Sequence, residues 1–172
     1  MSNTNPEIQQ YILTLDDLRG QVAAMIKDLP AEGLNWRPTL PVGADPTNSL
    51  AVLAIHIAGA EHYWIAECIG EYPATRVRDE EFAFVAESAE EPLRRLNAVG
   101  DETSAVLGGL KEADLTRTFT KEGRQVPARW AIHHCIFHAS LHIGHMQLTY
   151  QLWADGKATT TSPRWFDRLL KN

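Results

Sequence analysis

The sequence predicts an all-α protein built on a four-helix bundle. Three observations predict it. Four long segments carry apolar residues at intervals of three and four, which is the helical period. Stretches rich in proline and glycine, or in charge, separate these segments, and no internal repeat is present. Because 172 residues fit one domain, we expect residues 1–172 to form a single bundle.

The first helix is expected from Pro6 to about Leu29. Its apolar positions at helical spacing are Ile8, Ile12, Leu15, Leu18, Val22 and Ile26. Proline suits a first turn, and Pro30 with Gly33 ends the helix. The next stretch, residues 31–47, holds three prolines and two glycines, so we expect it to be irregular.

The second helix is expected to begin at Asn48 or Ser49, both good N-caps, and to end at Gly70. It is apolar on most sides, which predicts a central position in the bundle. Residues 71–87 are expected to form a charged connection. A third helix is expected from about Ser88 to Leu110, with Ser88 and Glu91 at the spacing of a capping box.

The fourth helix is expected from about Ala128 to Ala154, and Asp155-Gly156 ends it. Residues 114–127 alternate and contain a Glu-Gly turn, which predicts a small hairpin or an extended lid before this helix. Trp165–Leu170 is expected to form a short extra C-terminal helix.

Composition excludes several classes of function. The net charge of −6 argues against a nucleic-acid binder that works through a general basic surface. No apolar run reaches about 18 residues, so no membrane span is expected. Cys68 and Cys135 are too few and too far apart for a disulfide framework, and the N-terminus has no signal-peptide pattern. We therefore expect a cytoplasmic protein with no nucleic-acid or membrane partner.

Histidine is the unusual residue type, because five of the seven histidines lie between positions 133 and 145. At about 100° per residue, His134, His138, His142 and His145 share one narrow face of the fourth helix, and His133 lies off it. Burying several imidazoles on one face is unfavourable unless each finds a partner. A metal ion would be such a partner, although single buried histidines are more often hydrogen-bonded core residues.

His56, in the apolar second helix, supplies the missing third imidazole. Nothing in its local sequence satisfies the ring, so it should point across the bundle and complete a three-histidine site with an open position. His62 faces elsewhere on that helix, and Glu67 is about three turns away, so no carboxylate ligand is evident.

Other chemistries fit less well. The sequence has no HExxH motif, no Glu-x-x-His pairs of the di-iron type, no nucleophile elbow and no phosphate-binding glycine loop. Neither cysteine has the basic neighbours of an activated thiolate, although His134 precedes Cys135. A nucleophile is therefore expected to come from a thiol or a water activated at the metal, with His134 or His145 as a candidate proton carrier.

Two segments resemble the DinB-like (YfiT-like) superfamily of metalloenzymes. The first runs LNWRPTLPVGADPTNSLAVLAIHIAGAEHYW and contains Trp36-Arg37-Pro38, Asn48-Ser49 and His56. The second, HCIFHASLHIGHMQL, is similar to the final H-x₃-H-x-G-x helix of the family and contains His138, His142 and Gly144. The family often has Gln after that glycine, where this chain has His145. The resemblance covers most of residues 8–154.

The resemblance implies a divalent metal ion held by His56, His138 and His142, with zinc or nickel expected and iron as a further candidate. It also implies a homodimer, and Ala58, Gly59 and Ala66 would permit close approach of a second chain. Several relatives are S-transferases or isomerases that use low-molecular-weight thiols. We therefore expect a metal-dependent thiol transferase.

Three alternatives stay open. The same three-histidine site could serve a metal-dependent hydrolase. A fourth protein ligand, His134 or His145, would instead close the site and indicate a non-catalytic metal- or ligand-binding bundle. In the third alternative the histidines only pack, within a helical dimerisation module.

Overall fold

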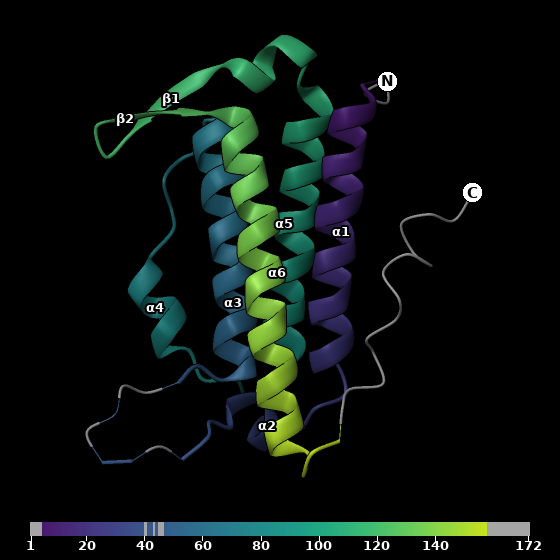
Figure 1. The fold of residues 1–172 in the computed structure, drawn as a ribbon, viewed down its shortest axis with the longest axis vertical. Coiled ribbons are helices and arrows are strands. Elements are labelled where there is room, and N and C mark those ends of the chain that lie inside the picture. Colours follow the sequence, from purple (N-terminus) through teal and green to yellow (C-terminus); the bar gives the residue numbers. More distant parts are fainter. Residues whose placement is uncertain (1–4, 40, 43, 45–46, 158–172) are drawn as a thin grey trace.

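The computed structural model describes residues 5–39, 41–42, 44 and 47–157. Within them, the expected four long helices run side by side (Figure 1): α1 (Pro6–Ile26), α3 (Leu50–Glu61) with its continuation, α5 (Glu90–Gly109) and α6 (Ala128–Trp153). Both α1 and α3 pack against α5 on one side and α6 on the other. The fold is therefore the all-α four-helix bundle that the sequence predicts.

The helices begin where the sequence places their caps. The Asn5 side chain accepts hydrogen bonds from the backbone N–H groups of Glu7 and Ile8 at the start of α1. Ser49 caps α3 by accepting from Val52 N–H at 3.3 Å. The expected capping box of the third helix is wrong: Ser88 Oγ accepts from Glu90 N–H, and α5 begins only at Glu90.

The second long helix changes its hydrogen bonding halfway along. After Glu61 it continues as a π-helical segment, η1 (His62–Ile69), in which bonds reach five residues back, as from Gly70 N–H to Ile65 O at 2.9 Å. Such a segment rotates the following side chains away from the positions that an α-helix would give them. The directions of the side chains after residue 61 therefore differ from those that an ideal α-helix gives.

Two segments expected only to connect the long helices contain short helices. The first is α2 (Ala31–Asn35), where the Asn35 side chain bonds both backbone groups of Ala86. The second is α4 (Arg78–Ala83), whose first turn carries three acidic residues that favour a helix N-terminus. Figure 1 shows α4 beside α3, on the outside of the bundle. This second correction matters for the site, because α4 carries Glu81.

The predicted hairpin is confirmed. A 3₁₀ turn, η2 (Glu112–Thr116), leads into β1 (Thr118–Lys121) and β2 (Arg124–Pro127), which pair antiparallel with Lys121 opposite Arg124. Glu122 and Gly123 both have positive φ, as a two-residue hairpin turn of the primed type requires. The expected C-terminal helix at Trp165–Leu170 lies outside the described residues.

The core is centred on α3, where Ala51, Ala54 and Ile57 are buried as the apolar pattern predicts. The small residues expected to admit a second chain are not available to one. Ala58 and Ala66 are buried within the bundle, and Gly59 lies against Glu81 of α4. No described helix has the length and apolar character needed to cross a bilayer.

Candidate metal centre

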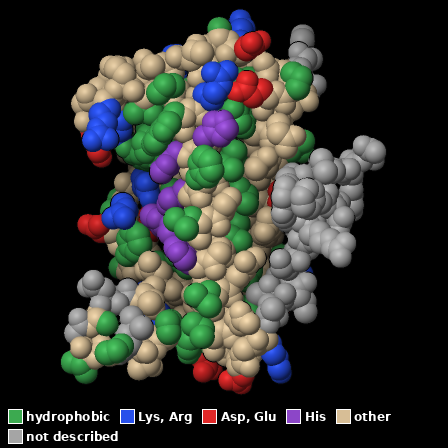
Figure 2. All heavy atoms as spheres, in the orientation of Figure 1, with side chains coloured by type: hydrophobic (Ala, Val, Ile, Leu, Met, Phe, Trp, Pro, Cys, Tyr) green, Lys and Arg blue, Asp and Glu red, His purple; other side chains and the backbone are tan. Residues whose placement is uncertain are grey.

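The histidine stripe on α6 forms as the sequence predicts. The rings of His134, His138, His142 and His145 follow one another along the helix, with successive centroids 5.8, 4.4 and 5.4 Å apart. Figure 2 shows the stripe on the surface of the bundle. His133 lies off it, with Nε2 3.1 Å from the Tyr11 hydroxyl of α1.

Three imidazoles from two helices converge at the middle of this stripe. His56 comes from α3, and its Nε2 lies 3.0 Å from Nε2 of His138. The His56 ring is also 5.1 Å from the ring of His142, centroid to centroid. One nitrogen from each of the three histidines lies within 4.8 Å of the others. Among the described residues, no other group of three such side chains is close enough to hold a metal ion.

The geometry fits a metal ion. Two imidazole nitrogens bound to one tetrahedral ion at about 2.05 Å would be about 3.3 Å apart, close to the 3.0 Å between His56 and His138. All three nitrogens lie within 4.8 Å of one another, so small side-chain rotations would bring them to this spacing. Three imidazoles without a carboxylate suit zinc, nickel, iron and copper alike.

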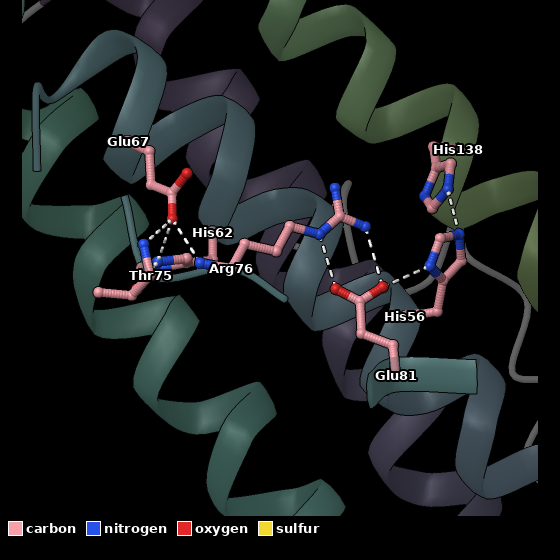
Figure 3. A network of polar contacts seen from close by, with 7 residues as sticks. All are labelled: His56, His62, Glu67, Thr75, Arg76, Glu81 and His138. Atoms are coloured by element: carbon pink, nitrogen blue, oxygen red, sulfur yellow. Dashed lines mark hydrogen bonds and ion pairs between the residues drawn. The ribbon is translucent and has the colours of Figure 1, made fainter. Parts of the chain in front are cut away.

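A carboxylate orients His56 from the side opposite the cluster. Glu81 Oε2 lies 2.7 Å from His56 Nδ1, and Arg76 binds the same carboxylate through Nε at 2.6 Å and Nη2 at 2.9 Å. Figure 3 shows the line from Arg76 through Glu81 and His56 to His138. Burial raises the pKa of Glu81, but hydrogen bonds from Arg76 and His56 outweigh it, so the pKa is lowered overall.

This contact determines which nitrogen of His56 is free. An ionised carboxylate only accepts hydrogen bonds, so Nδ1 must carry the proton that it donates to Glu81. Nε2, which faces His138, then carries the lone pair. A carboxylate, a histidine and a metal ion in this order form the arrangement by which proteins commonly fix a ligating imidazole.

Burial also favours the ligating form of the other two imidazoles. It lowers the pKa of His138 to about 3 and that of His142 to about 4, with neighbouring histidines lowering both values further. Both rings are therefore neutral at pH 7. A neutral imidazole is the form that binds a metal ion.

The remaining candidates lie at the edges of the cluster. His134 is packed between Trp64 and Trp130, and it stacks on Trp130 with a centroid distance of 5.0 Å. His145 is exposed, with Nδ1 3.3 Å from Nδ1 of His142. Neither belongs to the group of three described above.

His62 and Glu67 lie apart from the centre, as expected. His62 Nδ1 is 2.7 Å from Glu102, and its Nε2 is 3.2 Å from Glu67. Glu67 also accepts the backbone N–H groups of Thr75 and Arg76 at 2.6 and 2.8 Å (Figure 3). These two hydrogen bonds fix the connection after η1, so that the Arg76 side chain reaches Glu81.

Sequence reasoning missed Glu81 and Arg76, and it assigned Gly59 to contact with a second chain instead of with Glu81. The unsatisfied ring of His56 was the available signal, because it required a partner. The connection that supplies the partner, residues 71–87, contains several acidic residues, and their spacing does not show which one reaches His56.

Fold and site together define a helical-bundle protein with a three-histidine cluster that could hold a metal ion. The model of the DinB superfamily matches residues 14–146, well over half of the chain. The chain belongs to the DinB superfamily.

A crystal structure of a conserved protein from Enterococcus faecalis has a similar fold. The TM-score is 0.66, the identity 20%, and the match covers 86% of this chain and 96% of that one. At this identity the likeness establishes the fold alone. A comparison with curated proteins finds no match.

Proposed function

We propose that this protein is a divalent-metal-dependent enzyme whose protein ligands are His56, His138 and His142. The observation that carries the proposal is the convergence of three imidazoles from α3 and α6, one of them held by a buried carboxylate. A structural role for the histidines would not require His56 and His138 to direct Nε2 atoms at each other at 3.0 Å.

The residues around the three imidazoles favour an enzyme over a non-catalytic bundle whose metal site is closed by a fourth protein ligand. His134 and His145 lie outside the group, which favours three protein ligands and a position open to another molecule. When bound there, a divalent ion would supply a Lewis acid that lowers the pKa of a thiol or a water molecule. Glu81 would keep His56 oriented, and Arg76 would keep Glu81 ionised.

The reaction that we propose is the transfer of an electrophilic group to the sulfur of a low-molecular-weight thiol. It is supported by family membership together with the absence of a suitable protein nucleophile among the described residues. Burial raises the pKa of Cys68 to about 11 and raises that of Cys135 well above its usual value. A hydrolase would use the same site with water in place of the thiol.

The test begins with the metal content of protein purified without a histidine tag. We expect about one divalent ion per chain, with zinc or nickel favoured and iron next. His142→Ala should lose stoichiometric metal, whereas the matched variant His133→Ala, off the stripe, should retain it. Full occupancy in His142→Ala would contradict the ligand assignment and direct attention to His134 or His145.

The reaction is tested by screening the metal-loaded protein with low-molecular-weight thiols and electrophiles, and in parallel with small esters. Conjugation that His56→Ala abolishes would support the transferase. Ester cleavage without conjugation would support the hydrolase. Stoichiometric metal with neither activity would favour the non-catalytic binding protein.

We also propose a homodimer, formed through α6 instead of the covered face of α3. Phe137, Leu141, Leu148 and Leu152 are 53–71% exposed and recur at intervals of four and seven along this helix. Such spacing puts them on one stripe, the pattern of a helix that packs against another helix. The stripe lies beside the histidines on the helix surface (Figure 2), so a dimer would place a second chain near the site.

A further inference from the structure

A large cavity lies beside the three-histidine cluster. Its volume is about 660 Å³, and its walls come from η1, the connection before α4, the first residue of α4, the hairpin and the start of α6. The size is in the range of small-molecule sites. Three aromatic rings line it: Tyr63, Trp64 and Trp130.

Two chains of ring contacts join this cavity to the cluster. Trp64 and Trp130 pack on His134, whose ring centroid is 5.8 Å from that of His138. On the other side, Arg78 lies 4.7 Å over the Phe82 ring, and Phe82 is 4.8 Å from His56. One side chain therefore separates the cavity wall from the cluster on each route: His134 on the first and Phe82 on the second.

The cavity is positively charged although the chain carries a net charge of −6. Arg76, Arg78, Lys121 and Arg124 line it, against a single acidic residue, Glu122. Arg76 is neutralised by Glu81. Within residues 5–39, 41–42, 44 and 47–157, no ion pair is found for Arg78, Lys121 or Arg124.

The hairpin holds two of these cations where they repel each other. Lys121 and Arg124 are directly opposite in the β1–β2 register, and like charges at such positions are destabilising. Lys121 lies 4.2 Å over the Tyr63 ring, which keeps its ammonium group at the cavity wall. An anion between the two side chains would remove the repulsion and form charge-assisted hydrogen bonds.

We propose that this cavity binds the anionic group of a small organic substrate. The anion, a carboxylate or a phosphate, lies among Arg78, Lys121 and Arg124, and the apolar or aromatic body of the molecule packs on Trp64 and Trp130. The inference deepens the proposed function, because it names the class of molecule presented to the site. It rests on that function only through the nearness of cavity and cluster.

The test is calorimetric titration of the full-length protein, both as purified and after chelator treatment. The probes are benzoate, phenyl phosphate and the neutral benzamide, which share one aromatic ring. We expect at least one anion to bind ten or more times as tightly as benzamide. Added salt should weaken the binding of the anion and leave the binding of benzamide unchanged. Preference for benzoate identifies a carboxylate, and preference for phenyl phosphate identifies a phosphate. Equal binding of all three probes, or no binding, would overturn the proposal.

Variants distinguish anion binding in the cavity from a general effect of the charge of the protein. Lys121→Gln combined with Arg124→Gln should weaken anion binding about tenfold and leave benzamide unchanged. The matched control is Lys27→Gln with Lys157→Gln, which removes the same charge from exposed positions at the opposite end of the bundle (Figure 1). An equal loss in the control would overturn the assignment to the cavity. Because the probes contain no thiol and are also tested without metal, failure here and failure of the proposed function give different results.

Discussion

Gly59 lies so close to Glu81 that a Cβ atom at position 59 would overlap the carboxylate oxygen Oε1. The glycine follows His56 by three residues on α3, so it faces the same side of that helix. The absence of a side chain there lets Glu81 of α4 reach the imidazole.

Gly59→Ala should therefore weaken metal binding without removing a ligand. The added methyl group displaces Glu81, and loss of a carboxylate behind a ligating histidine commonly costs about 10–100-fold in metal affinity. Competition with a chromophoric chelator measures the change. Gly20→Ala is the control, because nothing lies within 4 Å of a Cβ there. Unchanged affinity in Gly59→Ala would show that Glu81 does not support the metal.

Glu81→Gln tests the charge of the same residue. The amide keeps the shape of the side chain but cannot remain an anion beside Arg76 and His56, so we expect a loss of metal affinity of about 10–100-fold. Glu80→Gln makes the same change of charge at an exposed neighbouring position and should have little effect. Because Gly59→Ala and Glu81→Gln act on one hydrogen bond, the double variant should be little worse than either single variant. Additive losses would mean that the two residues act separately.

These contacts also show how far the sequence alone could lead. The four long helices and the histidine stripe follow from repeating patterns within single segments, which local periodicity encodes directly. The Glu81–His56 contact joins residues 25 positions apart in the sequence. It depends on where α4 packs, and on space left by a glycine on another helix, neither of which has a periodic signature.

The interpretation of the small residues on α3 and η1 failed for the same reason. Ala58, Gly59 and Ala66 do allow close approach, but the approaching groups belong to the same chain. The pattern indicates a tight contact and cannot distinguish α4 from a second protomer. The exposure of the apolar stripe on α6, from Phe137 to Leu152, is by contrast visible only once the other three long helices are in place.

The pKa values of His138 and His142 predict a pH dependence of stability in metal-free protein. In the unfolded chain both imidazoles have a pKa of about 6.5, whereas in the folded chain burial lowers the pKa of His138 to about 3 and that of His142 to about 4. Between these limits the unfolded chain binds protons that the folded chain does not. The free energy of unfolding should therefore fall as the pH drops from about 7 to about 4.

Urea midpoints measured at pH 7 and pH 5 check this expectation. Replacing both residues, as His138→Asn with His142→Asn, removes the two titrating groups and should make the midpoint less dependent on pH. An equal pH dependence in the two proteins would show that other groups are responsible. The same pKa values imply that protons compete with a metal ion at these two residues only at low pH. Metal affinity should therefore fall less steeply between pH 7 and pH 5 than unperturbed histidines would predict.

The exposed apolar stripe on α6 gives a direct test of whether the protein forms a homodimer. A homodimer of the 19.2 kDa chain should have about twice that mass by light scattering at micromolar concentration. Leu141→Asp with Leu148→Asp would put charges into the buried interface and should give monomers. Val85→Asp changes a residue that is 72% exposed but lies outside α6, and it should leave the mass unchanged. A wild-type mass of about 19 kDa would exclude the dimer.

The cysteines test whether the protein itself supplies a nucleophile. Cys135 is buried and Cys68 is half-buried, and burial raises the pKa of both thiols, so the thiolate fraction at pH 7 is very small. Both should react slowly with a disulfide reagent in the native protein and rapidly after unfolding. Cys135→Ala should keep its metal and its activity in the thiol-conjugation and ester assays, with a loss of stability of about 1 kcal/mol from the smaller core side chain. His56→Ala should lose both metal and activity. Inactive Cys135→Ala protein that still holds its metal would identify a cysteine enzyme and contradict the proposed chemistry.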